Sequence, residues 1–401
     1  MALLLPSISQ AQARPWFRLG GNAVPVYTYA DPVPRGGSLG EIRLVQPTLM
    51  LHAGAFDDRL TLLGMLNLEG LTIPNGELAP GDWGEGFMDR RHPHTYLHEA
   101  MLSYFQPVGE AMVSVSAGKG FAPFGTDDPM SRPVLRYPVN HHLAQILERA
   151  VGILGVRAGP ILLEGALFNG DEPERPRQWP RLSRFGDSWS GRLTVFPISS
   201  AEIQASRAHV HSPEHRPGFG TDQSKWSVSG RWTGAVKQHP VYALLEWERT
   251  SEAEGFFVFH SLLAEAAAGA GNSRLYYRLE RTERPEEERI LNPFRSARPH
   301  LENSILGTTR WTIQTAGYGY RLSAGRLLDA VPFLEISYGT IANVGGGLFE
   351  VESFYGRKSF WSLSGGVRLA AGMPLHRMGR YGVAQDTAKH LMSPHHTRHA
   401  E

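Results

Sequence analysis

The sequence of 401 residues contains no cysteine, no long apolar run and no excess of charge of one sign. The absence of cysteine excludes disulfide frameworks, cysteine-based metal sites and thiol catalysis. No apolar run approaches the roughly 18 residues that a membrane-spanning helix needs. The 40 basic side chains balance the 39 acidic ones, so bulk charge gives no reason to expect nucleic acid or another polyanion as a partner.

The most regular pattern in the chain lies between residues 225 and 249. From Trp226 to Val236 every second residue is apolar or glycine, and the residues between them are serine, arginine and threonine, with alanine at the last position; Lys225 and Lys237 flank the segment. After a turn at Gln238-His239-Pro240 the alternation resumes and runs through Trp247. Two alternating segments joined by a short turn predict an antiparallel hairpin with one apolar face and one polar face.

These segments are longer than the about five or six residues usual in soluble sheets, and tryptophans lie near their ends. Strands of this length with aromatic ends are typical of a tilted crossing of a bilayer. In lipid, a closed barrel is the only structure besides a helix that satisfies all backbone hydrogen bonds. The pattern therefore predicts an all-β fold, a transmembrane antiparallel up-and-down β-barrel.

Short turns and long loops alternate between the predicted strands, as they do in outer-membrane barrels. A weaker strand at 17–29 would bring both chain ends to the periplasmic side and give about sixteen strands, enough to enclose an aqueous lumen. Residues 348–354 form either a loop or a further strand. The clear strands lie at 41–56, 59–69, 96–105, 112–121, 151–157, 162–168, 189–196, 202–210, 225–237, 241–249, 256–266, 274–281, 311–320, 333–341 and 360–371.

The chain divides into three predicted parts. Residues 1–13 combine a short apolar core with Ala11-Gln12-Ala13, and we interpret them as the remnant of a secretory signal peptide, with an ordinary apolar N-terminus as the alternative. Residues 14–372 form a single barrel domain, and residues 373–401 a histidine-rich C-terminal tail. Export agrees with the missing cysteines.

Over nearly its whole length the strand pattern resembles that of bacterial outer-membrane porins. The resemblance implies a bacterial outer-membrane location and a channel for passive diffusion of small hydrophilic solutes. It also implies contact with outer-membrane lipid, a homotrimeric assembly, and one loop folded into the lumen as a constriction.

The stretch 118–149 is the least generic part of the sequence. It has proline-guided turns and a short helical pattern that Asn140 would cap. We expect the loop at 122–149 to fold inward, where side chains of both charge signs would set a transverse field across the pore; an external cap is the alternative. The candidate constriction residues are Asp127, Asp128, Arg132, Arg136, His141, His142, Glu148 and Arg149.

A second set of charged residues has the inward parity of the predicted strands. On any wet face polar residues are expected, so these residues indicate no more than a modest anion preference. The candidate pore-lining residues are Arg192, Arg231, Glu246, Glu248, Arg274, Arg278 and Glu280.

Two kinds of chemistry are not expected. The histidines do not form a set of four metal ligands with a known spacing, so we predict neither a metal nor another cofactor. No G-x-S-x-G, H-E-x-x-H or P-loop motif is present, so we expect no enzyme. The alternatives are a lipid-modifying outer-membrane barrel enzyme and an exported soluble β-sandwich that binds glycans. The histidines considered were His92, His94, His98, His141, His142, His395, His396 and His399.

Overall fold

A computed structural model describes most of the chain, in eight segments. The predicted signal remnant at 1–13 lies outside them, as do His92, His94, His395, His396 and His399. The segments are 15–32, 37–73, 95–173, 176–213, 220–287, 305–324, 328–345 and 347–385.

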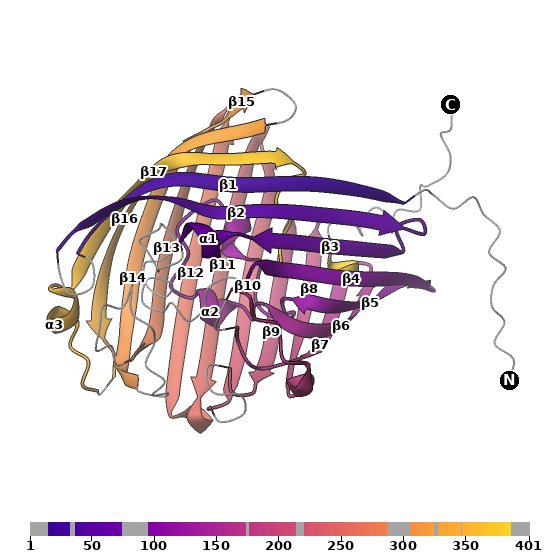
Figure 1. The fold of residues 1–401 in the computed structure, drawn as a ribbon, viewed down its shortest axis with the longest axis horizontal. Coiled ribbons are helices and arrows are strands. Elements are labelled where there is room, and N and C mark those ends of the chain that lie inside the picture. The colour runs from indigo at the N-terminus through magenta and orange to yellow at the C-terminus, as the bar shows by residue number, and fades with distance from the viewer. Residues whose placement is uncertain are drawn as a thin grey trace, which may run out of the picture.

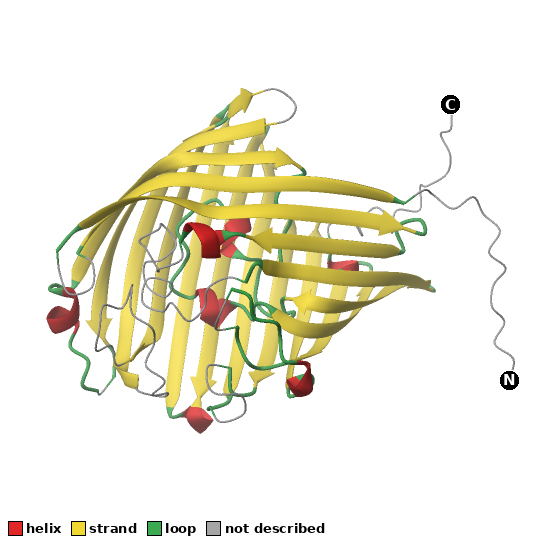
Figure 2. Ribbon diagram, in the orientation of Figure 1, coloured by secondary structure: helices red, strands yellow, loops and turns green. Residues whose placement is uncertain are grey.

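Strands dominate these segments (Figure 2). They are β1 (Trp16–Asp31), β2 (Leu39–Ala55), β3 (Leu60–Asn67), β4 (Leu97–Val108), β5 (Ala111–Gly120), β6 (Arg149–Ala158), β7 (Ile161–Phe168), β8 (Ser188–Ile198), β9 (Ala201–Val210), β10 (Gln223–Val236), β11 (His239–Glu252), β12 (Phe257–Ala270), β13 (Ser273–Glu287), β14 (Ile305–Tyr320), β15 (Leu322–Ala324), β16 (Leu328–Asn343) and β17 (Ser359–Gly372).

The strands form one closed antiparallel sheet (Figure 1). Neighbours in sequence are neighbours in the sheet, and β1 pairs with both β2 and β17. The three-residue β15 pairs with β16, while β14 pairs with β16 directly, so sixteen strands make the wall. The predicted up-and-down barrel of about sixteen strands is confirmed, and the alternative of two stacked sheets is wrong.

The described helices are short, and none of them is long and apolar enough to cross a membrane. The alternative of a strand at 348–354 is wrong, because Phe349, Val351 and Tyr355 pack with Trp311 and Phe360 instead of extending the sheet. The α-helices are α1 (Glu69–Thr72), α2 (His141–Ala144) and α3 (Val351–Tyr355), and the 3₁₀ turns are Pro129–Ser131, Leu182–Arg184, Ala253–Gly255 and Gly382–Ala384.

Short turns gather at one end of the barrel, and the longest loops leave the other end. Gly109, Gly159 and Gly271 occupy such turns at positive φ, a backbone conformation that favours glycine. The hairpin between β10 and β11 turns at Lys237 and Gln238, with φ of 49° and 71°, slightly before the predicted turn. Outer-membrane barrels keep their short turns on the periplasmic side, so the long loops of this chain face outside.

The outer surface carries an apolar band. Leu154 and Leu245 lie in the middle of their strands and are more than half exposed, at 55% and 56%. This band lies between two girdles of exposed aromatic rings, which is the surface that lipid covers in outer-membrane barrels. The chain is therefore an outer-membrane barrel with an apolar outer band. The girdle residues include Trp189, Trp226, Trp247 and Trp361 toward the loop end and Tyr104, Tyr318 and Tyr320 toward the turn end.

A charge placed on this band tests its contact with lipid. Leu245→Arg puts a cation at mid-height on β11, and we expect it to lower the free energy of unfolding in lipid vesicles by about 2–4 kcal/mol. Val236→Arg is the matched control, because Val236 is equally outward but ends β10, where the loss should be about 0–1 kcal/mol. Equal losses at the two positions would contradict a lipid-facing band.

Candidate pore constriction

The loop between β5 and β6 folds into the barrel. Its base is closed by a backbone hydrogen bond from Ala122 N to Ile146 O, at 3.0 Å. The side chains described between residues 121 and 148 are buried, apart from the half-buried Ser131 and Tyr137. A loop with this many charged groups can be buried only if the wall offers partners for them.

Gly125 shows how closely the loop packs. Its φ is +63°, and a Cβ atom there would lie 1.9 Å from the carbonyl oxygen of Ala144. The amide of Gly125 donates to Ser206 Oγ on β9 at 2.9 Å, and its carbonyl accepts from Arg192 on β8 at 3.3 Å. Only glycine fits this close approach between the two arms of the loop.

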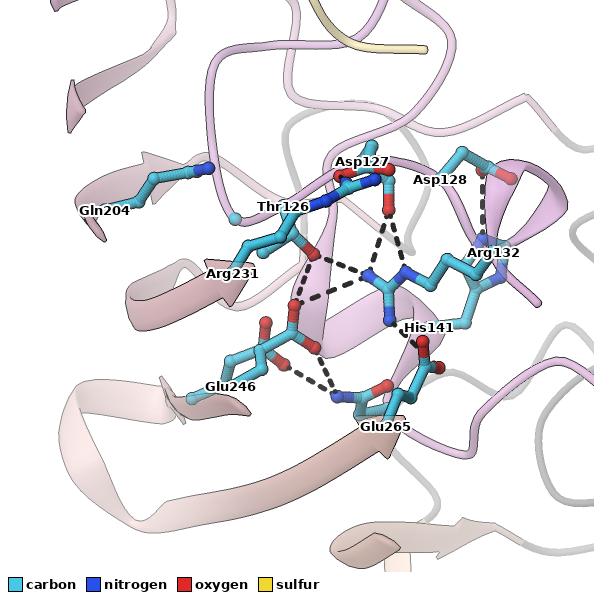
Figure 3. A network of polar contacts seen from close by, with 12 residues as sticks. Thr126, Asp127, Asp128, Arg132, His141, Gln204, Arg231, Glu246 and Glu265 are labelled. Carbon is cyan, nitrogen blue, oxygen red and sulfur yellow. Dashed lines mark hydrogen bonds and ion pairs between the residues drawn. The ribbon is translucent and has the colours of Figure 1, made fainter. Parts of the chain in front are cut away.

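Arg132 is the centre of the contact between the loop and the far wall (Figure 3). Its guanidinium lies 3.4 Å from Glu246 on β11 and 3.8 Å from Glu265 on β12. It also donates to Thr126 Oγ1 at 2.5 Å, and Thr126 in turn donates to Glu246. The buried charge of Arg132 is thus balanced by carboxylates of two neighbouring strands.

The rest of the loop is bound to the same side of the barrel. Asn140 donates to Glu246 at 3.0 Å and to Glu248 at 3.2 Å. The amide of Val139 donates to Glu280 on β13 at 2.7 Å, and the amide of Leu135 to Glu335 on β16 at 2.7 Å. Since β13 lies halfway round the ring from β5, the loop crosses the lumen.

Arg136 joins this network through both its side chain and its backbone. Its guanidinium pairs with Glu280, and its carbonyl oxygen accepts a hydrogen bond from Arg278. Arg278 is itself paired with Glu265 at 2.6 Å. Alternating positive and negative groups therefore connect the loop to β12 and β13.

Asp127 connects three parts of the molecule. Its carboxylate accepts hydrogen bonds from Arg231 on β10, from Arg377 beyond β17 at 3.0 Å, and from Ser131 within the loop at 2.9 Å. Burial by itself would raise the pKa of this carboxyl. The guanidinium groups around it, those of Arg231, Arg377, Arg132 and Arg380, hold the pKa of Asp127 well below its usual range.

The other predicted constriction residues have local contacts. Asp128 caps the Pro129–Ser131 turn by accepting from Met130 N at 2.7 Å, and it lies 3.5 Å from the ring of His141. His141 also stacks on Tyr137 with ring centroids 4.9 Å apart. His142 belongs to α2, and its side chain lies outside the part of the chain that the structure describes.

Glu148 and Arg149 lie at the base of the loop and not at its centre. Glu148 accepts from Thr95 N at 3.0 Å and lies 2.5 Å from the ring of His98. Arg149 donates to Leu147 O at 2.6 Å and pairs with Glu172 at 2.7 Å. These contacts fasten the end of the loop that leads into β6.

The predicted pore-lining residues all lie on the inner face, but most of them bind the loop. Glu246, Glu248, Arg278 and Glu280 have the loop contacts given above, and Arg231 pairs with Asp127. Arg192 pairs with Glu164 on β7 at 2.7 Å. Arg274 differs: it lies near the turn end, it is exposed, and no carboxylate contact is seen for it within the described segments.

Sequence reasoning missed the carboxylates that complete this network. In the sequence these carboxylates are marked only by their position on the inward-facing side of a strand, which can be recognised once the strand itself has been assigned. Glu265 was hidden because the alanine-rich β12 does not alternate clearly between apolar and polar residues. The missed residues are Glu99, Glu164, Glu202, Glu265 and Glu335.

A second segment, residues 373–385, also lies inside the barrel. Arg377 donates to Glu202 on β9 at 2.6 Å, and Tyr381 donates to Glu99 on β4. His376 lies 2.7 Å from Glu99 as well. The first part of the predicted C-terminal tail is thus bound to the inner wall and, through Asp127, to the loop.

Arg380, in the middle of this segment, is buried beside other arginines and keeps its positive charge. Burial and the charges of Arg192 and Arg377 lower the pKa of Arg380 to about 9, so its guanidinium stays protonated at neutral pH. Glu202 lies 3.7 Å away, and Arg192 donates to Gly379 O at 2.9 Å. The segment therefore adds positive charge to the side of the lumen lined by β7, β8 and β9.

Comparison with solved structures identifies the architecture. An anion-selective porin from Comamonas acidovorans aligns with 89% of this chain and 100% of its own, at 10% identity and a TM-score of 0.52. OmpF of Salmonella typhi, solved in complex with daunomycin, aligns with 88% of this chain and 97% of its own, at 10% identity and a TM-score of 0.53. The chain has the fold of a bacterial outer-membrane porin.

No protein-family model and no curated protein matches the chain. Within the described segments, no three histidine, aspartate or glutamate side chains are arranged to hold a metal ion. His98, one of the histidines considered from the sequence, is buried against Glu148.

Asp127 gives a test of how firmly the loop is bound. Asp127→Asn removes a buried carboxylate from beside Arg231 and Arg377, and we expect the free energy of unfolding at pH 7 to fall by about 3 kcal/mol. Because the folded-state pKa is lowered, the ionised group stabilises the wild type above the unfolded pKa of about 3.9. That contribution is lost only as the pH falls through the lower folded value.

Asp329→Asn is the control for this experiment. Asp329 pairs with Arg321, and both side chains are largely exposed, so the loss should be about 0–1 kcal/mol. Chemical unfolding in vesicles at pH 7 and at pH 3 measures both variants. A small effect of Asp127→Asn at pH 7 would show that the buried pairs do not hold the loop.

Proposed function

We propose that this protein is a channel through which small hydrophilic solutes diffuse passively across the bacterial outer membrane. The observation that carries the proposal is a closed barrel with a polar inner face whose β5–β6 loop crosses the lumen and is bound to the far wall. A loop fixed in this way narrows the passage but does not act as a moving gate. The charged side chains of the loop favour some solutes over others. A homotrimeric assembly stays a prediction from the resemblance to porins.

The balance of charge along the pore favours the passage of anions. Four wall carboxylates are occupied by donors of the loop, whereas Arg274 is exposed near the periplasmic end. A positive group at the mouth of a pore raises the local concentration of anions. The first of the two similar porins named above is described as anion-selective, which agrees with this proposal. The four carboxylates are Glu246, Glu265, Glu280 and Glu335.

A lipid-modifying enzyme is the alternative. Such an enzyme needs a nucleophile, a base and an orienting group within hydrogen-bond reach. Within the described segments, the hydrogen bonds to histidine rings involve carboxylates and one backbone carbonyl, and no serine hydroxyl. We include the absence of catalysis in the proposal.

Arg274 tests the selectivity. We expect Arg274→Gln to lower the permeability ratio of chloride to potassium by about twofold, a small change, because one charge in a wet vestibule interacts weakly with a passing ion. Lys237→Gln is the control, since Lys237 lies in the periplasmic turn between β10 and β11, and it should leave the ratio unchanged. Reversal potentials in a salt gradient give the ratio. An unchanged ratio in Arg274→Gln would contradict the role given to this residue.

The C-terminal segment gives a test of the channel itself. Protein refolded in vitro and added to a planar bilayer should open in ohmic steps, and a silent bilayer would contradict the proposal. A chain that ends after Gly372 lacks residues 373–385 in its lumen, so we expect larger steps. A chain that ends after Gln385 keeps this segment and is the matched control, with wild-type steps. Equal conductance of the two truncated chains would show that the segment does not narrow the passage.

A further inference from the structure

The outer wall carries a row of basic and aromatic side chains across four neighbouring strands. In the register of the sheet, Arg207 on β9 pairs with Trp226 on β10, Trp226 pairs with Arg249 on β11, and Arg249 pairs with His260 on β12. All four have outward parity, and Arg207, Trp226 and His260 are exposed. Since paired strands lie about 4.8 Å apart, these side chains form a continuous row across the four strands.

The row lies at the external end of the barrel. Arg207 is close to the end of β9, where the chain leaves for a long connection, and Trp226 is close to the start of β10. Trp189 and Trp247, 41% and 40% exposed, belong to the same aromatic girdle. Such girdles mark the level at which lipid headgroups begin, so the row faces the headgroups of the outer leaflet.

Arg207 is held in place by rings and not by an acid. Its guanidinium carbon lies 4.6 Å from the ring centroid of Trp226 and 5.7 Å from that of Trp189. Contact with ring faces occupies the flat side of a guanidinium and leaves its N–H groups for an acceptor. The arginine is therefore oriented before any ligand arrives, which lowers the entropy that binding must overcome.

The nearby carboxylates have other partners. Asp222 lies 2.6 Å from His211 and 3.5 Å from His209. Glu283 lies 3.0 Å from His260 and is paired with Arg310. Across the described segments, neither Arg207 nor Arg249 has a carboxylate contact, so two positive charges face the membrane surface without a negative partner from the protein.

We propose that Arg207 and Arg249, on either side of Trp226, bind the phosphate groups of a phosphorylated lipid in the outer leaflet. Guanidinium groups recognise phosphate through paired N–H···O bonds, and a phosphate at this level supplies the missing negative charge. Two strand spacings separate the arginines, a span of about 10 Å, which suits a headgroup with two phosphates. The acyl chains of this lipid pack below the row, over the exposed side chains of Trp247 and Val228.

The binding of two lipids tests this site. The wild type in detergent is titrated with diphosphorylated lipid A and with its fully dephosphorylated form, and retained lipid is counted by native mass spectrometry. We expect the phosphorylated lipid to bind the double variant Arg207→Gln, Arg249→Gln at least about tenfold more weakly than the wild type. The dephosphorylated lipid should bind weakly to both. Ohmic conductance should be unchanged, which separates this outcome from a failure of the channel proposal.

Arg18→Gln is the control, because Arg18 also lies over a tryptophan, Trp16, at 5.2 Å, but it has the inward parity of β1 and lies at the periplasmic end of that strand. It should bind phosphorylated lipid like the wild type. Three results would overturn the proposal: equal binding of the two lipids, wild-type binding by the double variant, or displacement of the lipid by millimolar inorganic phosphate, which would identify free phosphate as the ligand.

Discussion

Backbone hydrogen bonding in lipid is the constraint on which the rest of the structure depends. Hydrocarbon offers no water to unpaired N–H and C=O groups, so a sheet can remain in a membrane only if it has no free edge. The pairing of β1 with β17 removes that edge. Closure then separates every strand into a face for lipid and a face for the lumen, and it creates the enclosed space in which charged groups can gather.

The enclosed charges explain why the β5–β6 loop is fixed. A buried carboxylate without a partner is costly, and Glu246, Glu280 and Glu335 each obtain donors from the loop. The loop in turn buries Arg132 and Arg136, which need those carboxylates. Because each side depends on the other, removing one charge leaves several groups unpaired, and the loop behaves as part of the wall.

Arginines on the inner and on the outer face of the barrel both need groups that stabilise their charge, but the two faces supply different groups. Inside, Arg192 and Arg278 are paired with glutamates of neighbouring strands. Outside, Arg207 lies between tryptophan rings at the level of the headgroups. A carboxylate beside Arg207 would add a second charged group to the lipid-facing wall, whereas rings remain compatible with both acyl chains and headgroups. The lipid surface therefore limits which partners an arginine can have.

How well a part of the structure can be predicted depends on how far apart in the sequence its interacting residues are. In β13, Leu275 and Leu279 point outward and Arg278 and Glu280 inward, as their alternation predicts. In β12 the alanine-rich stretch weakens the same signal, and Glu265 was missed. The expected turn after β10 was close to the observed one, because turn residues act on their immediate neighbours.

The sequence by itself determined the barrel, its approximate number of strands and the two faces of its wall. Alternation and turns are local properties of the chain, and they decide directly which side chains can face lipid and which can face water. Only the tertiary structure decided which charges meet. Asp127 contacts Arg231 and Arg377. Those three residues are far apart in the chain and close only after the barrel has closed. For the same reason the position of residues 373–385 inside the lumen could not be predicted. Their partners Glu99 and Glu202 belong to strands that lie far away from them in the sequence.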